Sequence, residues 1–287
     1  MNTLLSIDQA TCIKCGKCVK VCPSLIFTQA TKGGEVIPEH IDDCIKCGHC
    51  VAVCPTNSVI HQTFPASKVH AIDYVQMPTP EQILLLTRAR RSNRAFSKSP
   101  ISQANLDLIL EAAHRAPTAS NLQQVSFTLI TDPEKLKQIT DFTIGIFSDA
   151  IKKLENPLLR PLLKRIMPDA YKYVPTFHRL MEQHAQGNDL ILRGATAALL
   201  IHTPKKCRFG CQDSNLAYQN GSLMAESLGI NQFYMGFVCS ATTQPGGDKL
   251  AQMLGINGKI HAAMALGMPA FRFPNYIDKE DINLTQL

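Results

Sequence analysis

Apolar side chains beyond residue 80 recur at intervals that distinguish helices from strands. Residues 81–90 and 102–115 repeat Ile, Leu and Ala every three or four positions, which predicts two amphipathic helices. Ser102 stands where the second helix would take its N-cap. Apolar runs predict strands, and two longer polar–apolar stretches predict further helices. The expected strands are 125–130, 197–202, 232–238 and 260–266, and the further helices are 213–228 and 247–254.

This order of elements indicates an α+β fold with a mixed sheet flanked by helices. Residues 142–187 differ from their surroundings because four prolines interrupt a partly helical pattern. We expect this segment to be a variable insertion that either forms a lid over a bound molecule or packs against another copy of the chain.

The first 62 residues contain few large apolar side chains and an internal repeat. Residues 7–18 resemble residues 41–50, and each cysteine recurs 32 positions later. A proline-containing stretch without amphipathic pattern follows. We therefore predict three parts: a small domain at 1–64, a linker at 65–80 and a larger domain at 81–287.

Eight of the eleven cysteines lie in this repeat, in two runs of Cys-x2-Cys-x2-Cys-x3-Cys-Pro. The spacing is typical of a [4Fe–4S] site in which three cysteines of one run hold a cluster and the fourth holds the other cluster. Gly16 and Gly48 leave room for the backbone to approach inorganic sulfide. The predicted ligands are Cys12, Cys15, Cys18 and Cys54 for one cluster, and Cys44, Cys47, Cys50 and Cys22 for the other.

Zinc and disulfides are the alternatives for these cysteines. Structural zinc uses paired knuckles and has no need of a third cysteine at this spacing, and no secretion signal accompanies a disulfide framework. The segment 5–62 resembles the two-cluster bacterial ferredoxin domain. The remaining Cys207, Cys211 and Cys239 are expected in the core.

A basic turn, Arg90-Arg91-Ser92-Asn93-Arg94, follows the first predicted helix of the larger domain. Its guanidinium groups and hydroxyl suit a phosphate, although a solvated helix end explains the same residues equally well. Further candidates for a flavin site are the polar loop 116–123, the glycine at Gly236 and the arginine at Arg272. Met235 is either a sulfur facing the flavin or a core residue.

Taken together, these segments resemble the nitroreductase family of FMN-binding homodimers over residues 80–275. The resemblance rests on the basic turn, the loop Ala-Pro-Thr-Ala-Ser-Asn-x-Gln, the segment 192–196 and Leu-Gly-Met-Pro at 266–269. It implies FMN at the subunit interface, with the phosphate on Arg90, Ser92 and Arg94. It also implies contacts of the ring with Ser120, Asn121 and Gln123, and of N5 with Gly236. The chain departs from the family in having Gln124-Val125 in place of Pro-Trp, and Ala270 where many members have lysine.

The sequence thus predicts an iron–sulfur flavoprotein oxidoreductase that reduces a small electrophilic acceptor, such as a nitroaromatic or a quinone. The donor would be NAD(P)H or an external ferredoxin. We assign no catalytic side chain, because flavin chemistry needs no nucleophile–base set. The alternative is an electron-transfer or redox-sensing protein without a small substrate.

Composition excludes few other classes. The net charge of +6 is spread without dense basic runs, so we expect no nucleic-acid partner. Apolar runs are too short for a membrane span, and the start of the chain lacks the features of a secretory signal. We expect a cytoplasmic location.

Overall fold

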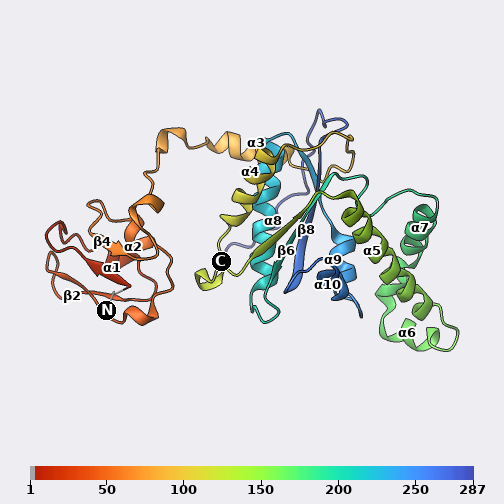
Figure 1. Cartoon of the computed structure of the whole chain (residues 1–287), viewed down its shortest axis with the longest axis horizontal. Helices are drawn as coiled ribbons and strands as arrows, with labels where there is room; N and C mark the ends of the chain where they lie inside the picture. Colours follow the sequence, from red (N-terminus) through yellow and green to blue (C-terminus); the bar gives the residue numbers. More distant parts are fainter. Residues whose placement is uncertain (1–3) are drawn as a thin grey trace. The chain divides into compact units, whose positions relative to one another are not determined.

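A computed structural model describes residues 4–287 (Figure 1). The chain divides into two compact units, each with its own core. The first runs as far as Pro78 and includes Ala119–Leu122, and the second comprises Thr79–Thr118 and Gln123–Leu287. Residues 65–78, expected to be a linker, thus group with the first unit, and most of them are exposed.

The first unit is a pair of two-stranded antiparallel sheets with short helices and 3-10 turns. Its strands are β1 (Leu5–Ile7), β2 (Phe27–Gln29), β3 (Val36–Pro38) and β4 (Val59–His61), and its helices are α1 (Lys17–Val21) and α2 (His49–Ala52). Strand β1 pairs with β4, and β2 pairs with β3. A small apolar cluster that includes Leu5, Ile26 and Phe27 forms the core.

The second unit is built on a sheet with the order β5–β6–β8–β7, whose strands all pair antiparallel. The strands are β5 (Ser126–Ile130), β6 (Ala197–Thr203), β7 (Asn231–Tyr234) and β8 (Lys259–Gly267). An isolated bridge between Ser92 and Gln232 of β7 adds a parallel pairing to this sheet.

Alternating side chains of β6 and β8 supply two apolar layers. Leu199 and Ile201 pack on the side of α4 (Gln103–His114) and α8 (Gly210–Ser227). Ala198 and Leu200 pack on the opposite side, with α5 (Pro133–Leu154), α9 (Gly236–Thr242) and α10 (Lys249–Met253). Figure 1 shows these helices along the two faces of the sheet. The α+β architecture flanked by helices is therefore confirmed.

Local capping explains where the predicted helices begin. Helix α3 (Pro80–Ala89) starts with a reciprocal capping box between Thr79 and Gln82. Ser102 caps α4, as predicted, by accepting a hydrogen bond from the Asn105 N–H.

The segment 142–187 does not begin at a structural boundary, because residue 142 lies inside the 22-residue helix α5. Asp132 caps this helix and Pro133 occupies its first turn. Helices α6 (Arg160–Ile166) and α7 (Val174–Ala185) follow, separated by a 3-10 turn at Pro168–Tyr173. Pro161, Pro168 and Pro175 stand in first turns, where their missing N–H groups leave no intrahelical bond unmade, and Pro157 lies in the turn before α6.

The prediction of a strand at 232–238 is wrong beyond Tyr234. Strand β7 ends there, and α9 begins at Gly236 after Met235. The apolar run Phe233–Val238 has the composition of a buried strand, but its second half becomes a buried helix, and periodicity cannot separate the two over so few residues.

None of the helices within residues 4–287 combines the length and the apolar character needed to cross a membrane.

Candidate functional site

The eight N-terminal cysteines surround two small cavities in the first unit, of about 20 and 10 Å³. Four cysteines line each cavity, three from one sequence run and one from the other. The sets are Cys12, Cys15, Cys18 and Cys54, and Cys22, Cys44, Cys47 and Cys50. The structure therefore brings together the side chains that the crossed ligand pattern pairs.

The sequence repeat is also a repeat of backbone conformation. Gly16 (φ 70°) and Gly48 (φ 76°) occupy the N-cap positions of α1 and α2 in the left-handed region, which glycine adopts without cost. In both loops the N–H two residues beyond the first cysteine donates to its sulfur: Lys14 to Cys12 and Lys46 to Cys44, each at 3.4 Å. N–H groups directed at sulfur suit a thiolate ligand.

The polar surroundings of the two sets differ. The Ser58 N–H donates to Cys54 Sγ at 3.3 Å. Burial alone would raise the pKa of Cys54, but hydrogen bonds from Thr56 and Ser58 outweigh it and lower that pKa. Burial raises the pKa of the third cysteine in both runs, that of Cys18 and that of Cys50, the latter to about 11.

His61 adds a contact specific to the second set. Its Nε2 lies 3.6 Å from Cys44 Sγ, and the imidazole is 3% exposed.

Among the described residues, no group of three or more His, Cys, Asp or Glu side chains converges on the position of a single metal ion.

The second unit contains a cavity of about 1140 Å³. One part of its wall comes from α5, α6 and α7, and another from the end of β7 and the start of α9. Phe147 and Phe177 stack in this wall, with ring centroids 4.3 Å apart and planes at 13°. The volume lies at the upper end of the usual range of about 300–1,000 Å³ for a small-molecule site, so the cavity is large enough for a ligand of substantial size.

Two of the predicted flavin residues, Arg94 and Gly236, line this cavity. The Arg94 guanidinium lies over the Phe233 ring, which lines the same space. Arg193 also lines it and was not among the candidates from sequence. Arg193 lies in the segment 192–196, on which the resemblance partly rests, but the resemblance implies no cofactor contact for that segment.

The other predicted cofactor residues lie elsewhere. Arg91 and Arg272 line a separate cavity of about 220 Å³ together with Glu226. Burial raises the pKa of Glu226, while the charges of Arg90 and Arg272 act in the opposite direction. Ser92 forms the edge bridge with Gln232.

Met235 is 1% exposed and packs in the core, so its side chain does not face the large cavity. Ser120 and Asn121 belong to the turn Ala119–Asn121, which groups with the first unit. Gln123, at φ 51°, donates its N–H to Thr118 Oγ1 at 3.0 Å. Within the second unit, the candidate residues thus divide between the large cavity, the smaller cavity and the core.

The three remaining cysteines were expected in the core. This is wrong for Cys211, which is exposed, and for Cys207, which is half-buried and belongs to none of the apolar clusters. Cys239 is half-buried and packs against the core of the second unit. Burial raises its pKa to about 11, which keeps the thiol protonated near neutral pH.

Comparisons with known proteins agree with this division of the chain. A model described as "Nitroreductase family" matches residues 87–268, and one described as "4Fe-4S dicluster domain" matches residues 4–69. The chain is 26% identical over 183 residues to the NADPH-flavin oxidoreductase of Vibrio harveyi, a match that covers 63% of each protein. It is 26% identical over 156 residues to an NADPH-dependent oxidoreductase of Staphylococcus saprophyticus, covering 54% of this chain and 53% of that one. The chain thus spans less than two thirds of either relative.

Two solved structures share the fold. A nitroreductase with bound FMN from Bacteroides fragilis superposes with a TM-score of 0.54 and 22% identity, covering 71% of this chain and 99% of that one. A nitroreductase with bound FMN from Desulfitobacterium hafniense gives a TM-score of 0.54 and 20% identity, covering 71% and 97%.

Proposed function

The chain belongs to the nitroreductase family and begins with a 4Fe-4S dicluster domain, and from this we propose that it transfers electrons between two [4Fe–4S] clusters and FMN to reduce a small acceptor. The observation that carries the proposal is the grouping of cysteines from both repeats, four around each cavity, in the same chain as a flavin-type cavity. Clusters exchange single electrons, and FMN when bound supplies a group that can deliver two.

The cysteine sites suit clusters in the crossed arrangement. Each set offers four thiols, the number that a cubane requires. Gly16 lies at φ 70°, a conformation in which a residue with a side chain is strained, so the loop that carries Cys15 favours glycine at this position. We propose Cys12, Cys15, Cys18 and Cys54 as ligands of one cluster and Cys22, Cys44, Cys47 and Cys50 as ligands of the other.

The large cavity suits FMN. Arg94 supplies a positive charge for the phosphate or the electron-rich edge of the ring. Gly236, the first residue of α9, presents backbone without a side chain. We retain Arg90, Ser92, Ser120, Asn121 and Gln123 as FMN contacts on the resemblance alone, because the structure does not place them on this cavity.

An open cavity favours an enzyme over a relay protein. A relay has no need of space beside the flavin, whereas a cavity of about 1140 Å³ is compatible with FMN and an adjoining acceptor. The names of the relatives support NAD(P)H as the donor. We further propose a homodimer with FMN at its interface, a cytoplasmic location, and a nitroaromatic or quinone-like acceptor.

The test is anaerobic reduction of the purified protein. We expect about eight iron and eight sulfide per chain, with FMN, and bleaching of both chromophores by NADH, NADPH or reduced ferredoxin. Reoxidation by a nitroaromatic should follow. Protein that contains zinc without sulfide, or that holds no flavin, would contradict the proposal. Reduction by a donor without reoxidation by any small acceptor would favour the relay function.

A further inference from the structure

Two of the basic residues that line the large cavity, Lys153 and Arg193, are not assigned to FMN. Arg94, Lys153 and Arg193 line it, whereas Asp149 is the acidic residue of the lining. Asp149 already pairs with Lys152, with Oδ1 and Nζ 3.2 Å apart. The remaining walls are largely apolar and include Phe147, Phe177 and Phe237. Positive charge in such surroundings favours an anionic ligand.

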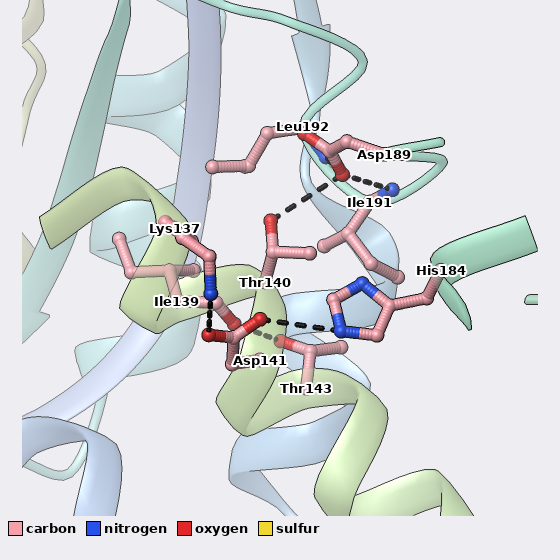
Figure 2. Close-up of polar contacts among 9 residues, drawn as sticks. All are labelled: Lys137, Ile139, Thr140, Asp141, Thr143, His184, Asp189, Ile191 and Leu192. Carbon is pink, nitrogen blue, oxygen red and sulfur yellow. Dashed lines mark hydrogen bonds and ion pairs between the residues drawn. The ribbon is translucent and has the colours of Figure 1, made fainter. Parts of the chain in front are cut away.

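Arg193 directly follows Ile191 and Leu192, whose N–H groups donate to the carboxylate of Asp189. Figure 2 shows this carboxylate with Thr140, Ile191 and Leu192. Asp189 Oδ1 accepts hydrogen bonds from the N–H groups of Ile191 and Leu192, both at 2.9 Å. The same oxygen accepts from Thr140 Oγ1, on α5, at 3.3 Å. The side chains of Ile191 and Leu192 are each 2% exposed, so the loop is anchored both by hydrogen bonds and by burial.

This anchoring fixes Arg193 in an uncommon conformation. Its φ of 56° lies in the left-handed region, and Gly194 follows at φ 74°. A residue with a side chain adopts this region at a cost, which persists where the surroundings impose it and is frequent at ligand sites. Asp189 Oδ2 also accepts from the Gly194 N–H at 3.5 Å, so one carboxylate contacts the backbone on both sides of Arg193.

The electrostatics of Arg193 show that its positive charge is incompletely balanced. Burial lowers the pKa of the guanidinium, and the like charges of Arg94 and Arg179 lower it further, whereas Asp189 acts in the opposite direction. The Asp189 carboxylate is at the same time engaged with backbone N–H groups. An anionic group within reach of Arg193 would therefore be stabilised by its guanidinium.

A polar contact also links the two helices, α5 and α7, that carry the aromatic part of the cavity wall. Asp141 on α5 lies 3.2 Å from Nε2 of His184 on α7, and Lys137 approaches its other oxygen at 2.5 Å (Figure 2). Helices α5 and α7 carry Phe147 and Phe177, whose rings stack in the cavity. The cavity thus combines a flat apolar surface with Arg193, whose backbone is anchored by Asp189.

We propose that Arg193, positioned by Asp189, binds an anionic group of the molecule that exchanges electrons with FMN. The anionic group is either a carboxylate on an aromatic acceptor or a phosphate on a nucleotide donor. The inference rests on the proposed function, and it assigns Arg193 to the substrate rather than to FMN.

The experiment compares an anionic and a neutral acceptor in stopped flow. Protein reduced with stoichiometric dithionite is mixed with 4-nitrobenzoate or 4-nitrobenzamide, and the second-order rate constant of flavin reoxidation is measured. For Arg193→Gln we expect a loss of about 10- to 100-fold with 4-nitrobenzoate, the range of one charge-assisted hydrogen bond, and a loss within about twofold with 4-nitrobenzamide. Arg193→Lys should recover part of the lost rate constant. Asp189→Ala should lower the rate constant for 4-nitrobenzoate more than that for 4-nitrobenzamide, because it removes the hydrogen bonds that anchor the loop.

A donor arm distinguishes the second source of the anion. If the anionic group is a nucleotide phosphate, Arg193→Gln instead slows flavin reduction by NADH or NADPH at subsaturating concentrations and leaves both acceptors unchanged. Arg165→Gln is the matched control, because Arg165 is exposed on α6 and does not line the cavity.

Equal losses with both acceptors and no donor effect would overturn the inference, as would release of FMN from Arg193→Gln, which would make Arg193 a cofactor ligand. Failure of the proposed function itself looks different, since the unmodified protein would then hold no flavin or react with neither acceptor.

Discussion

The guanidinium carbon of Arg94 lies 5.3 Å from the centroid of the Phe233 ring. This cation–π contact holds the arginine against the end of β7, and both residues line the large cavity. Arg94 Nη1 also donates to the Ser92 carbonyl at 3.2 Å, which tightens the basic turn.

Replacing Arg94 with alanine should therefore weaken FMN binding. One charge-assisted contact contributes about 1.5–3 kcal/mol, or roughly 10- to 100-fold in the dissociation constant. Fluorescence titration of flavin-depleted protein measures the change. Iron content should stay the same, since the cysteine sites belong to the other unit, and excess FMN should restore part of the activity.

Arg91→Ala provides the contrast, because Arg91 lines the smaller cavity with Arg272 and not the large one. We expect its effect on FMN affinity to be less than about threefold, a difference of about 0.6 kcal/mol. If Arg91→Ala releases FMN while Arg94→Ala retains it, the phosphate lies in the smaller cavity and the assignment of Arg94 is wrong.

The crossed cysteine sets predict which cluster each variant loses. Cys54 lines the cavity of Cys12, Cys15 and Cys18, although it follows the other run in sequence. Cys54→Ala should therefore impair the cluster of the first run, and Cys22→Ala that of the second. Electron paramagnetic resonance of the reduced protein, with iron analysis, should show one intact cluster of about four irons in each variant. Cys15→Ala identifies the spectrum that remains when the cluster of the first run is lost, and Cys54→Ala should give the same residual spectrum. A Cys54→Ala spectrum that instead matches that of Cys47→Ala would exclude the crossover.

Much of this organisation could be predicted from sequence because it depends on local spacing. The cysteine runs and the capping residue Ser102 act within a few positions along the chain, and both regularities reappear in the structure. The helix at Gly236 could not be predicted in the same way. The apolar character of residues 233–238 fits a buried strand or a buried helix, and only packing against the sheet decides between them.

Arg193 escaped prediction for a different reason. Its proposed role depends on Asp189, 4 positions away, and on Thr140, 53 positions away. Thr140 donates a hydrogen bond to the Asp189 carboxylate, which also accepts from the backbone next to Arg193. Spacing in sequence does not reveal which arginine reaches a cavity. The basic turn shows the converse, since Arg91 and Arg94 are near neighbours in sequence but line different cavities.

His61 should raise the reduction potential of the cluster held by the second cysteine run. Its Nδ1 accepts a hydrogen bond from the Thr63 N–H at 3.1 Å, so the neutral ring carries its proton on Nε2, the atom 3.6 Å from Cys44 Sγ. An N–H directed at a ligand sulfur stabilises the more negative, reduced cluster. His61→Phe should therefore make that potential more negative in a redox titration followed by electron paramagnetic resonance. His70→Phe, at an exposed position, is the control, and an equal shift in both variants would contradict a local effect of the imidazole.

Two histidines within the sheet, His202 on β6 and His261 on β8, should make the stability of the second unit depend on pH. His202 Nε2 lies 3.0 Å from Thr128 Oγ1, and His261 Nε2 lies 3.0 Å from Thr203 Oγ1. Burial lowers the pKa of both imidazoles, and the charge of Lys259 lowers that of His261 further. The folded state therefore takes up protons less readily than the unfolded state, whose histidines titrate near 6.5.

It follows that stability is full above pH 6.5 and is lost as the pH falls from there through the folded-state pKa values. The steepest possible slope is about 1.4 kcal/mol per pH unit for each histidine. Thermal unfolding followed by circular dichroism between pH 7.5 and 5 should show this decline, and the double variant His202→Gln/His261→Gln should flatten it. The raised pKa of Glu226 acts in the opposite direction, but it is present in both proteins and cancels from the difference. His70→Gln should leave the profile unchanged, because this side chain is exposed. A double variant that declines as steeply as the unmodified protein would assign the acid sensitivity to other groups.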